Sequence, residues 1–135
     1  GKEFEKIFYE NKNFKTQRIP KKAFSTYYTY AVFLVSSKSR NVSWSKFRKK
    51  FMHNGGDGIY AASRLIHQEP AIRKYKIGRC FKSCLNNCVV NCKGTPIAKK
   101  LQKKLLLFTT NQSNNIEIRK QIKALKKTIN FFNLD

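Results

Sequence analysis

Apolar residues recur along most of this chain at intervals of three and four positions, the spacing of one face of an α-helix. The first such face is short and consists of Phe4, Ile7 and Phe8. Pro20, a residue favoured in the first turn of a helix, precedes a second apolar set at helical spacing, made of Phe24, Tyr27, Tyr28, Ala31, Leu34 and Val35. We therefore predict helices at both places, although the β-branched and aromatic residues of the second set are also compatible with a strand.

The middle of the chain carries clearer helix boundaries. Ser43 is a favoured N-cap residue, and it precedes three aromatic side chains on one helical face, Trp44, Phe47 and Phe51. Asn54-Gly55-Gly56 then predicts the end of this helix, because these residues tolerate the left-handed backbone conformation. Asp57 is a second candidate N-cap, before a further apolar face made of Ile59, Ala62, Leu65 and Ile66.

The second half of the chain continues this pattern. Pro70 opens a helix that leads into the cysteines, with Ile72, Tyr75 and Ile77 on its apolar face. Thr95-Pro96 opens the next helix, with Ile97, Leu101, Leu105 and Phe108. The last helix is predicted over 116–132, after a polar loop, with Ile118, Ile122, Leu125, Ile129 and Phe132. The periodicity thus predicts an all-α fold, a compact bundle of about six short helices in a single helical domain spanning 1–135.

Positive charge greatly exceeds negative charge. The chain has 29 Lys and Arg residues against 7 Asp and Glu residues, a formal net charge of +22. No acidic residue occurs between Asn11 and Gly56, and Glu69 is the only one between Gly58 and Ile116. Self-repulsion at such a charge destabilises the compact state. A balance so one-sided predicts an acidic or polyanionic partner.

The basic residues form clusters, and on the last two predicted helices they fall mostly away from the apolar face. Together they predict a broad positive surface, whose affinity for a nucleic acid would come mainly from counterion release. The aromatic residues fall mostly on the apolar faces and are expected in the core rather than against bases. Besides Lys21-Lys22, the candidate anion-binding residues are Lys46, Arg48, Lys49, Lys50, Arg73, Lys74, Lys76, Arg79, Lys99, Lys100, Lys103, Lys104, Arg119, Lys120, Lys123, Lys126 and Lys127.

The four cysteines, Cys80, Cys84, Cys88 and Cys92, recur at every fourth residue. On an unbroken helix such neighbours lie about 5–6 Å apart at Cβ, whereas a disulfide needs about 3.8 Å. A turn at Leu85-Asn86-Asn87 would allow nested bridges, Cys84 with Cys88 and Cys80 with Cys92, and would make 80–92 a disulfide-stapled helical turn. The other pairings, four reduced and buried thiols, and a zinc site are the alternatives.

No set of residues predicts catalysis. The acidic residues are scattered, and no pair has a spacing suited to acid–base chemistry. The glycine-rich segment 54–58 lacks the Gly-Lys-Ser/Thr ending of a phosphate-binding loop, so we interpret it as a turn. His53 and His67 are interpreted as surface or core residues, with a metal-ligand or nuclease-like role as the alternative. We therefore expect a binding protein that is not an enzyme and has no cofactor, unless the cysteines hold zinc.

One short segment carries a recognisable pattern, made of Gly56, Gly58, Tyr60-Ala61, Arg64 and Gly78-Arg79-Cys80. Over these residues, about 25 positions, the chain resembles the cysteine-rich nucleic-acid-binding proteins of filamentous plant viruses. That family has two residues between the cysteines that follow Gly-Arg, whereas three separate Cys80 from Cys84 here, and the spacing before Gly78 is also longer. The resemblance therefore implies no zinc ligands in this chain.

These features predict a small, strongly basic, secreted protein that binds and inhibits an acidic host protein or a polyanion, such as heparin, another glycosaminoglycan or polyphosphate. Gly1 in place of Met is expected of a mature form after removal of a signal or transit segment, or of an expression scar. The first alternative is an intracellular or organellar nucleic-acid-binding protein, ribosome-associated or viral, with reduced or zinc-bound cysteines. The second alternative is a protein that acts on anionic membranes through basic amphipathic helices.

Overall fold

The structure is a computed structural model that describes residues 1–35, 42–60, 64–65, 69–70 and 95–134. The chain divides into two units, Gly1–Ala61 with Lys104–Asp135, and Ala62–Lys103. The first unit holds a four-stranded sheet and the helices α1, α2 and α6, whereas helix α5 (Pro96–Gln102) belongs to the second.

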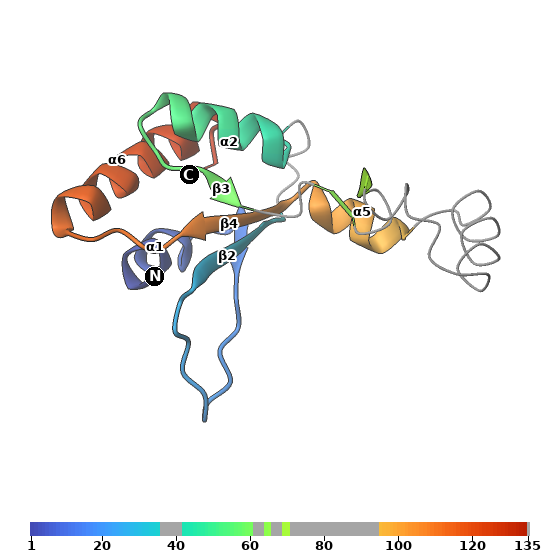
Figure 1. Ribbon diagram of the computed structural model, residues 1–135, viewed down its shortest axis with the longest axis horizontal. Helices are drawn as coiled ribbons and strands as arrows, with labels where there is room; N and C mark the ends of the chain where they lie inside the picture. The colour runs from blue at the N-terminus through green and yellow to red at the C-terminus, as the bar shows by residue number, and fades with distance from the viewer. Residues whose placement is uncertain (36–41, 61–63, 66–68, 71–94, 135) are drawn as a thin grey trace. The chain divides into compact units, whose positions relative to one another are not determined.

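An antiparallel sheet with the strand order β1-β2-β4-β3 forms the centre of the first unit (Figure 1). In its two central strands, the register pairs Tyr30 with Phe108 and Val32 with Leu106. These four side chains point to one face of the sheet and all are buried. The strands are β1 (Phe14–Thr16), β2 (Thr29–Leu34), β4 (Leu105–Thr109) and β3 (Ile59–Tyr60).

Two helices, α1 (Lys2–Phe8) and α2 (Trp44–His53), bring aromatic rings onto this face of the sheet. Phe108 lies among these rings, with centroid distances of 5.2 Å to Phe4, 5.5 Å to Phe8, 6.3 Å to Phe47 and 5.5 Å to Phe51. Edge-to-face and offset contacts at such distances are favourable beyond the area that they bury. The core of the first unit is therefore built around one phenylalanine of a central strand.

The helix predicted after Ser43 is confirmed as α2. The Oγ atom of Ser43 accepts a hydrogen bond from the backbone N–H of Lys46 at 3.3 Å, as an N-cap does. The predicted stop is confirmed as well, because α2 ends at His53 and Gly55 follows with a φ of 92°. Only glycine adopts this conformation without a steric cost from Cβ.

The last predicted helix is also confirmed, as α6 (Asn115–Phe131). The Oδ1 atom of Asn114 accepts from the backbone N–H of Glu117 at 2.9 Å, and Oε2 of Glu117 accepts from the backbone N–H of Ser113 at 3.0 Å. This reciprocal pattern fixes the start of the helix. Leu125 and Ile129 of α6 are buried in the same core as the sheet and the other helices. The short helix predicted at the start of the chain is confirmed as α1.

The predicted all-α bundle is wrong, because parts of three predicted helices form strands and the fold mixes helices with an antiparallel sheet. Residues 29–34 alternate strictly between partly exposed and buried positions, the period of a strand rather than a helix. Residues 105–109 form β4, whereas the helix expected to reach Phe108 ends at Gln102. Both segments are rich in apolar residues that pack well on a pleated surface, and pairing with each other decides their conformation.

Three further predictions concern the region from the end of α2 to the start of α5. Ile59 and Tyr60 form β3, so the helix expected after Asp57 does not begin there. The helix expected to follow Pro70 falls outside the described residues from position 71 onward. The predicted start at Thr95-Pro96 is confirmed, because α5 begins at Pro96. Among the helices that the structure describes, none is both long and apolar enough to cross a membrane.

Replacement of Phe108 tests the position of the core. We expect Phe108→Ala to lower the free energy of unfolding by about 3–5 kcal/mol, because its ring is 1% exposed and the void left behind cannot close fully. Phe24→Ala is the matched control, since that ring is 85% exposed and its loss changes stability by about 0.5 kcal/mol or less. Urea unfolding of both variants measures this. A similar decrease in the free energy of unfolding in both variants would contradict the assignment of Phe108 to the core.

Tyr30 makes the stability of the fold sensitive to alkaline pH. Its hydroxyl is buried without a hydrogen-bond partner in the described part of the chain. Burial, with smaller effects of Glu5 and Tyr27, raises the pKa of Tyr30 to about 12. Because the folded pKa lies above the unfolded value of 10.0, the stabilisation is complete below about pH 10 and is lost as the pH rises towards about 12.

We therefore expect Tyr30→Phe to be at least as stable as the parent near neutral pH, since the substitution removes an unsatisfied buried hydroxyl. Between about pH 10 and about pH 12, the variant should lose less stability than the parent does. Urea unfolding at several pH values measures the difference between the two proteins. Parallel stability curves across this range would contradict the burial of the phenol.

Candidate functional site

Helix α6 separates its charged residues from its buried residues. At about 100° per residue, its five basic side chains fall within about 120° of the helix circumference. They are Arg119, Lys120, Lys123, Lys126 and Lys127, and all are exposed. The buried residues lie on the other side of the helix and are Gln121, Ala124, Leu125, Thr128 and Ile129. The cluster predicted from the sequence thus forms a single cationic stripe along one helix.

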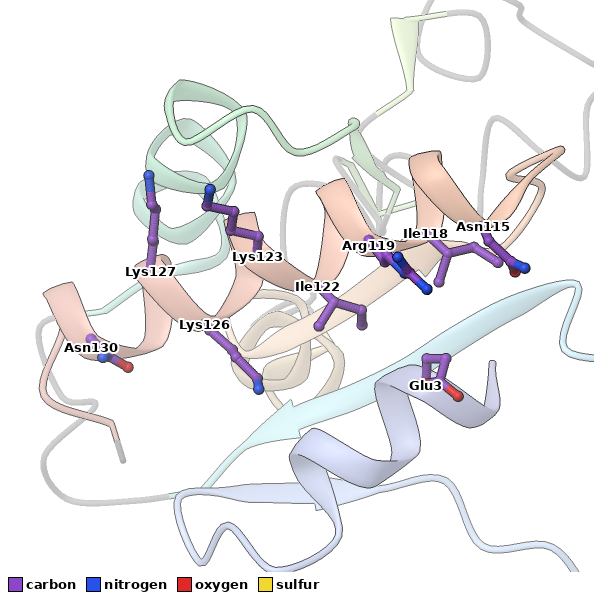
Figure 2. A pocket seen from close by; sticks show the side chains of 9 residues that line it. All are labelled: Glu3, Asn115, Ile118, Arg119, Ile122, Lys123, Lys126, Lys127 and Asn130. Carbon is purple, nitrogen blue, oxygen red and sulfur yellow. The ribbon is translucent and has the colours of Figure 1, made fainter.

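A groove runs along this stripe, with a volume of about 620 Å³. Its floor includes Ile118 and Ile122, and Figure 2 shows Ile122 and Lys126 on the side of α6 that faces α1. Lys123 and Lys127 point to the other side in the same view. The remaining lining residues are Glu3, Asn115, Arg119 and Asn130. The groove therefore combines four cations and one carboxylate with a small apolar floor.

Helix α2 adds further positive charge beside α6. The two helices pack together, with stacked rings of Phe47 and Phe132 at 5.9 Å. Lys50 bridges them, because its Nζ atom lies 3.9 Å from the ring centroid of Phe131. Lys46 and Lys49 are exposed on α2. We call the combined set the α2–α6 cationic surface: Lys46, Lys49, Lys50, Arg119, Lys120, Lys123, Lys126 and Lys127.

Four carboxylates of the first unit make contacts with groups outside this surface. Oε2 of Glu5 accepts from the hydroxyl of Tyr27 at 3.1 Å, and Oδ2 of Asp57 accepts from Nε2 of Gln112 at 3.2 Å. Glu117 serves the N-terminus of α6, as described above. Glu3, in the groove, pairs with Lys6 of its own helix at 2.6 Å. In these contacts, all four carboxylates are paired with groups outside the α2–α6 cationic surface.

Other predicted anion-binding residues lie elsewhere. Arg48 is half-buried, with its Cζ atom 5.9 Å from the ring centroid of Trp44. Lys104 is half-buried and its Nζ atom donates to the carbonyl of Val42 at 3.4 Å, while desolvation lowers its pKa. Lys99, Lys100 and Lys103 are exposed on and just after α5, in the second unit. Four more lie outside the described residues, Arg73, Lys74, Lys76 and Arg79.

The predicted cysteine chemistry is untested by the structure. Cys80, Cys84, Cys88 and Cys92 all fall outside the described residues, as does His67. His53 is exposed at the end of α2. Among the residues that the structure does describe, no three His, Cys, Asp or Glu side chains converge on a metal position. Disulfides, reduced thiols and zinc therefore stay predictions.

The glycine-rich segment after α2 is confirmed as a turn. The backbone N–H groups of Gly55 and Gly56 donate to the carbonyls of Met52 and Phe51. The N–H of Asp57 donates to Oε1 of Gln121 at 2.8 Å. A phosphate-binding loop needs such N–H groups directed at the ligand. Here they are used to end the helix and to fix the segment against α6.

One exposed feature was not predicted from the sequence, the loop that joins β1 to β2. We call residues 17–28 the arm. It carries Phe24 and Tyr28, which are 85% and 90% exposed, although the spacing of apolar residues placed both on a buried helical face. The turn-forming residues Pro20 and Ser25, with Lys21-Lys22 between them, were a sequence signal for a loop at this place.

Comparisons with family models, with curated proteins and with solved structures found no match to this chain. The resemblance of the segment 56–80 to viral nucleic-acid-binding proteins thus has no matching family model behind it. Any function has to be inferred from the chemistry of the described residues.

Proposed function

We propose that this protein binds nucleic acid through the α2–α6 cationic surface. The observation that carries the proposal is the segregation of five basic side chains onto one face of α6, beside the exposed lysines of α2. From Arg119 to Lys127 the stripe rises about 12 Å along the helix axis. For comparison, this length is the rise of about three or four nucleotide steps along one strand of a B-form duplex.

The composition of the surface favours a nucleic acid over an acidic protein. Seven of the eight residues that define it are lysines, and lysine is depleted in protein–protein interfaces, which have an apolar or aromatic centre. Protein–nucleic acid interfaces are more polar and strongly positive. A lysine contacts a phosphate as a point charge and needs no fixed planar geometry, so an open stripe of lysines is suited to a repeating phosphate backbone.

The inhibition of a secreted acidic protein stays a prediction, and so do the secreted location and the binding of glycosaminoglycans. The disulfides on which that prediction depends fall on Cys80 to Cys92, outside the described residues. A sulfated polymer would meet the same lysines by the same counterion release. Competition between heparin and RNA therefore shows only that they share a surface, and the salt dependence of individual lysine variants is more informative.

Salt dependence tests the proposal. If the five cations of α6 each neutralise one phosphate of a single strand, the slope of log K against log salt is about −3.5. Affinity then falls about 100-fold between about 50 and about 200 mM salt. The double variant Lys123→Gln/Lys127→Gln should bind more weakly at low salt, and its slope should be shallower by about 1.4. Fluorescence anisotropy with a labelled oligouridylate measures both quantities.

The matched control is Lys2→Gln/Lys12→Gln, which removes the same charge from two exposed lysines outside the α2–α6 cationic surface. It should change the slope much less than the α6 variant does. Equal changes in both variants would show attraction by net charge alone and would reject this surface as the binding site. Absence of binding at about 50 mM salt would reject the proposed function.

A further inference from the structure

The arm is a hairpin extension that projects from the sheet of the first unit (Figure 1). Arg18, Lys21 and Lys22 are exposed on it and make no hydrogen bond or ion pair with any described residue. No acidic residue lies in the arm or its flanking strands. Phe24 and Tyr28 expose their rings beside these cations. Exposed aromatic side chains next to unpaired positive charges are the combination with which proteins bind single-stranded nucleic acids.

Hydrogen bonds hold the base of the arm in place. Oε1 of Gln17 accepts from the backbone N–H of Ala31 at 3.3 Å, and Nε2 of Gln17 donates to Oγ of Ser25 at 3.3 Å. Oγ1 of Thr110, just after β4, donates to the carbonyl of Tyr28 at 3.0 Å and also to that of Tyr27. The two sides of the arm are thus tied to each other and to the central strand β4.

Tyr27, at the base of the arm, has an unusual backbone conformation and is held by two contacts. Tyr27 has a φ of 50°, a conformation that is uncommon for a bulky residue and has a steric cost. Its ring stacks on Tyr30 at 6.0 Å and its hydroxyl donates to Glu5, and these contacts help to offset that cost. By the alternation of β2, Tyr28 would share the buried face of Tyr30. Tyr28, however, precedes Thr29, the first residue of β2, and it is 90% exposed.

A hollow of about 560 Å³ lies beside the exposed ring of Tyr28. Thr26 and Asn111 line it, and their side chains make no hydrogen bond with the described residues. A hydroxyl and an amide next to an aromatic ring suit an unpaired nucleotide, because the base can stack while its polar edge or its sugar finds a hydrogen-bond partner.

We propose that the arm stacks unpaired bases on Phe24 and Tyr28, and that the protein therefore prefers single-stranded or locally unpaired nucleic acid to a duplex. This inference rests on the proposed function, since the α2–α6 cationic surface supplies contacts to phosphates. In a duplex the bases are already stacked on one another, so the two rings gain nothing from it. In a single strand each ring contributes about tenfold in affinity.

The placement of charge on the arm favours nucleic acid over a lipid bilayer as its partner. Lys21 and Lys22 form the turn at the tip, between Pro20 and Ala23, whose backbone groups are hydrogen-bonded at 2.9 Å. An arm that inserted Phe24 into a membrane would have to carry these ammonium groups towards the apolar layer first. That transfer is costly, whereas the same ammonium groups beside a phosphate backbone are stabilising.

The test is the affinity of Phe24→Ala/Tyr28→Ala for an oligouridylate and for a duplex of the same length, at one salt concentration. We expect about 100-fold weaker binding to the single strand, little change for the duplex and an unchanged salt slope. Tyr9→Ala is the matched control, since Tyr9 is 78% exposed after α1 and lies outside the arm. Phe24→Trp in a Trp44→Phe background should retain single-strand affinity, and the fluorescence of its one tryptophan should be quenched by the oligouridylate.

The outcomes distinguish failure of the arm from failure of the cationic surface. If the double alanine variant binds the single strand with wild-type affinity, the proposed role of the arm is wrong, but the proposed role of the α2–α6 cationic surface is unaffected. Equal losses for single strand and duplex also overturn base stacking. Failure of the wild-type protein to bind either nucleic acid overturns both proposals. If the tryptophan of Phe24→Trp shifts to the blue with phosphatidylserine vesicles but is not quenched by the oligouridylate, the arm binds membranes instead.

Discussion

The position of Phe108 in a central strand is the constraint on which the first unit depends. β4 pairs with β2 on one side and β3 on the other, so it connects segments from three distant parts of the sequence. Its phenylalanine ring receives rings from both α1 and α2. Because these ring contacts bury the apolar faces of the two helices against one face of the sheet, the polar faces of the helices are exposed to solvent. The cationic surface is the outer side of that core.

A chain with a net charge of +22 folds only if burial of apolar surface outweighs the mutual repulsion of its cations. The aromatic core supplies that burial, and the basic residues of α6 lie on the opposite side of the helix from it. The carboxylates take structural roles at a helix start, at a turn and at Tyr27. A polyanion that neutralises the outer face would relieve the repulsion, so binding and folding stability are linked.

The helices with strong local signals were predicted correctly from the sequence, and the sheet was not. Ser43 and Asn54-Gly55-Gly56 bracket α2 by residue types whose backbone preferences are local. The segment 105–108 is a continuous apolar run, and its spacing from Ile97 and Leu101 fits a helix as well as a strand. Its pairing with β2, more than 70 residues earlier, decides between them, and no local pattern contains that information.

One part of the candidate site was likewise predicted from the sequence, and another part was not. The stripe on α6 follows from helical spacing alone, and it was predicted from the sequence. The exposure of Phe24 and Tyr28 was not, because both lie in the loop between two strands that the sequence did not predict, at a place fixed by contacts such as that of Thr110 with the carbonyl of Tyr28. Hydrophobic periodicity assigns every aromatic residue to a core, so an exposed ring with a binding role is the kind of residue that it misses.

Photo-cross-linking of the wild-type protein to an oligouridylate, followed by identification of the linked peptides, tests most directly whether these two surfaces bind nucleic acid. If they do, the cross-links in the first unit fall in the arm, at 17–28, and on the α2–α6 cationic surface, at 46–50 and 119–127. They should disappear as the salt concentration rises, because the contacts to phosphates weaken. Cross-links that avoid both segments, or that follow exposed lysines of the first unit without preference, would contradict the assignment.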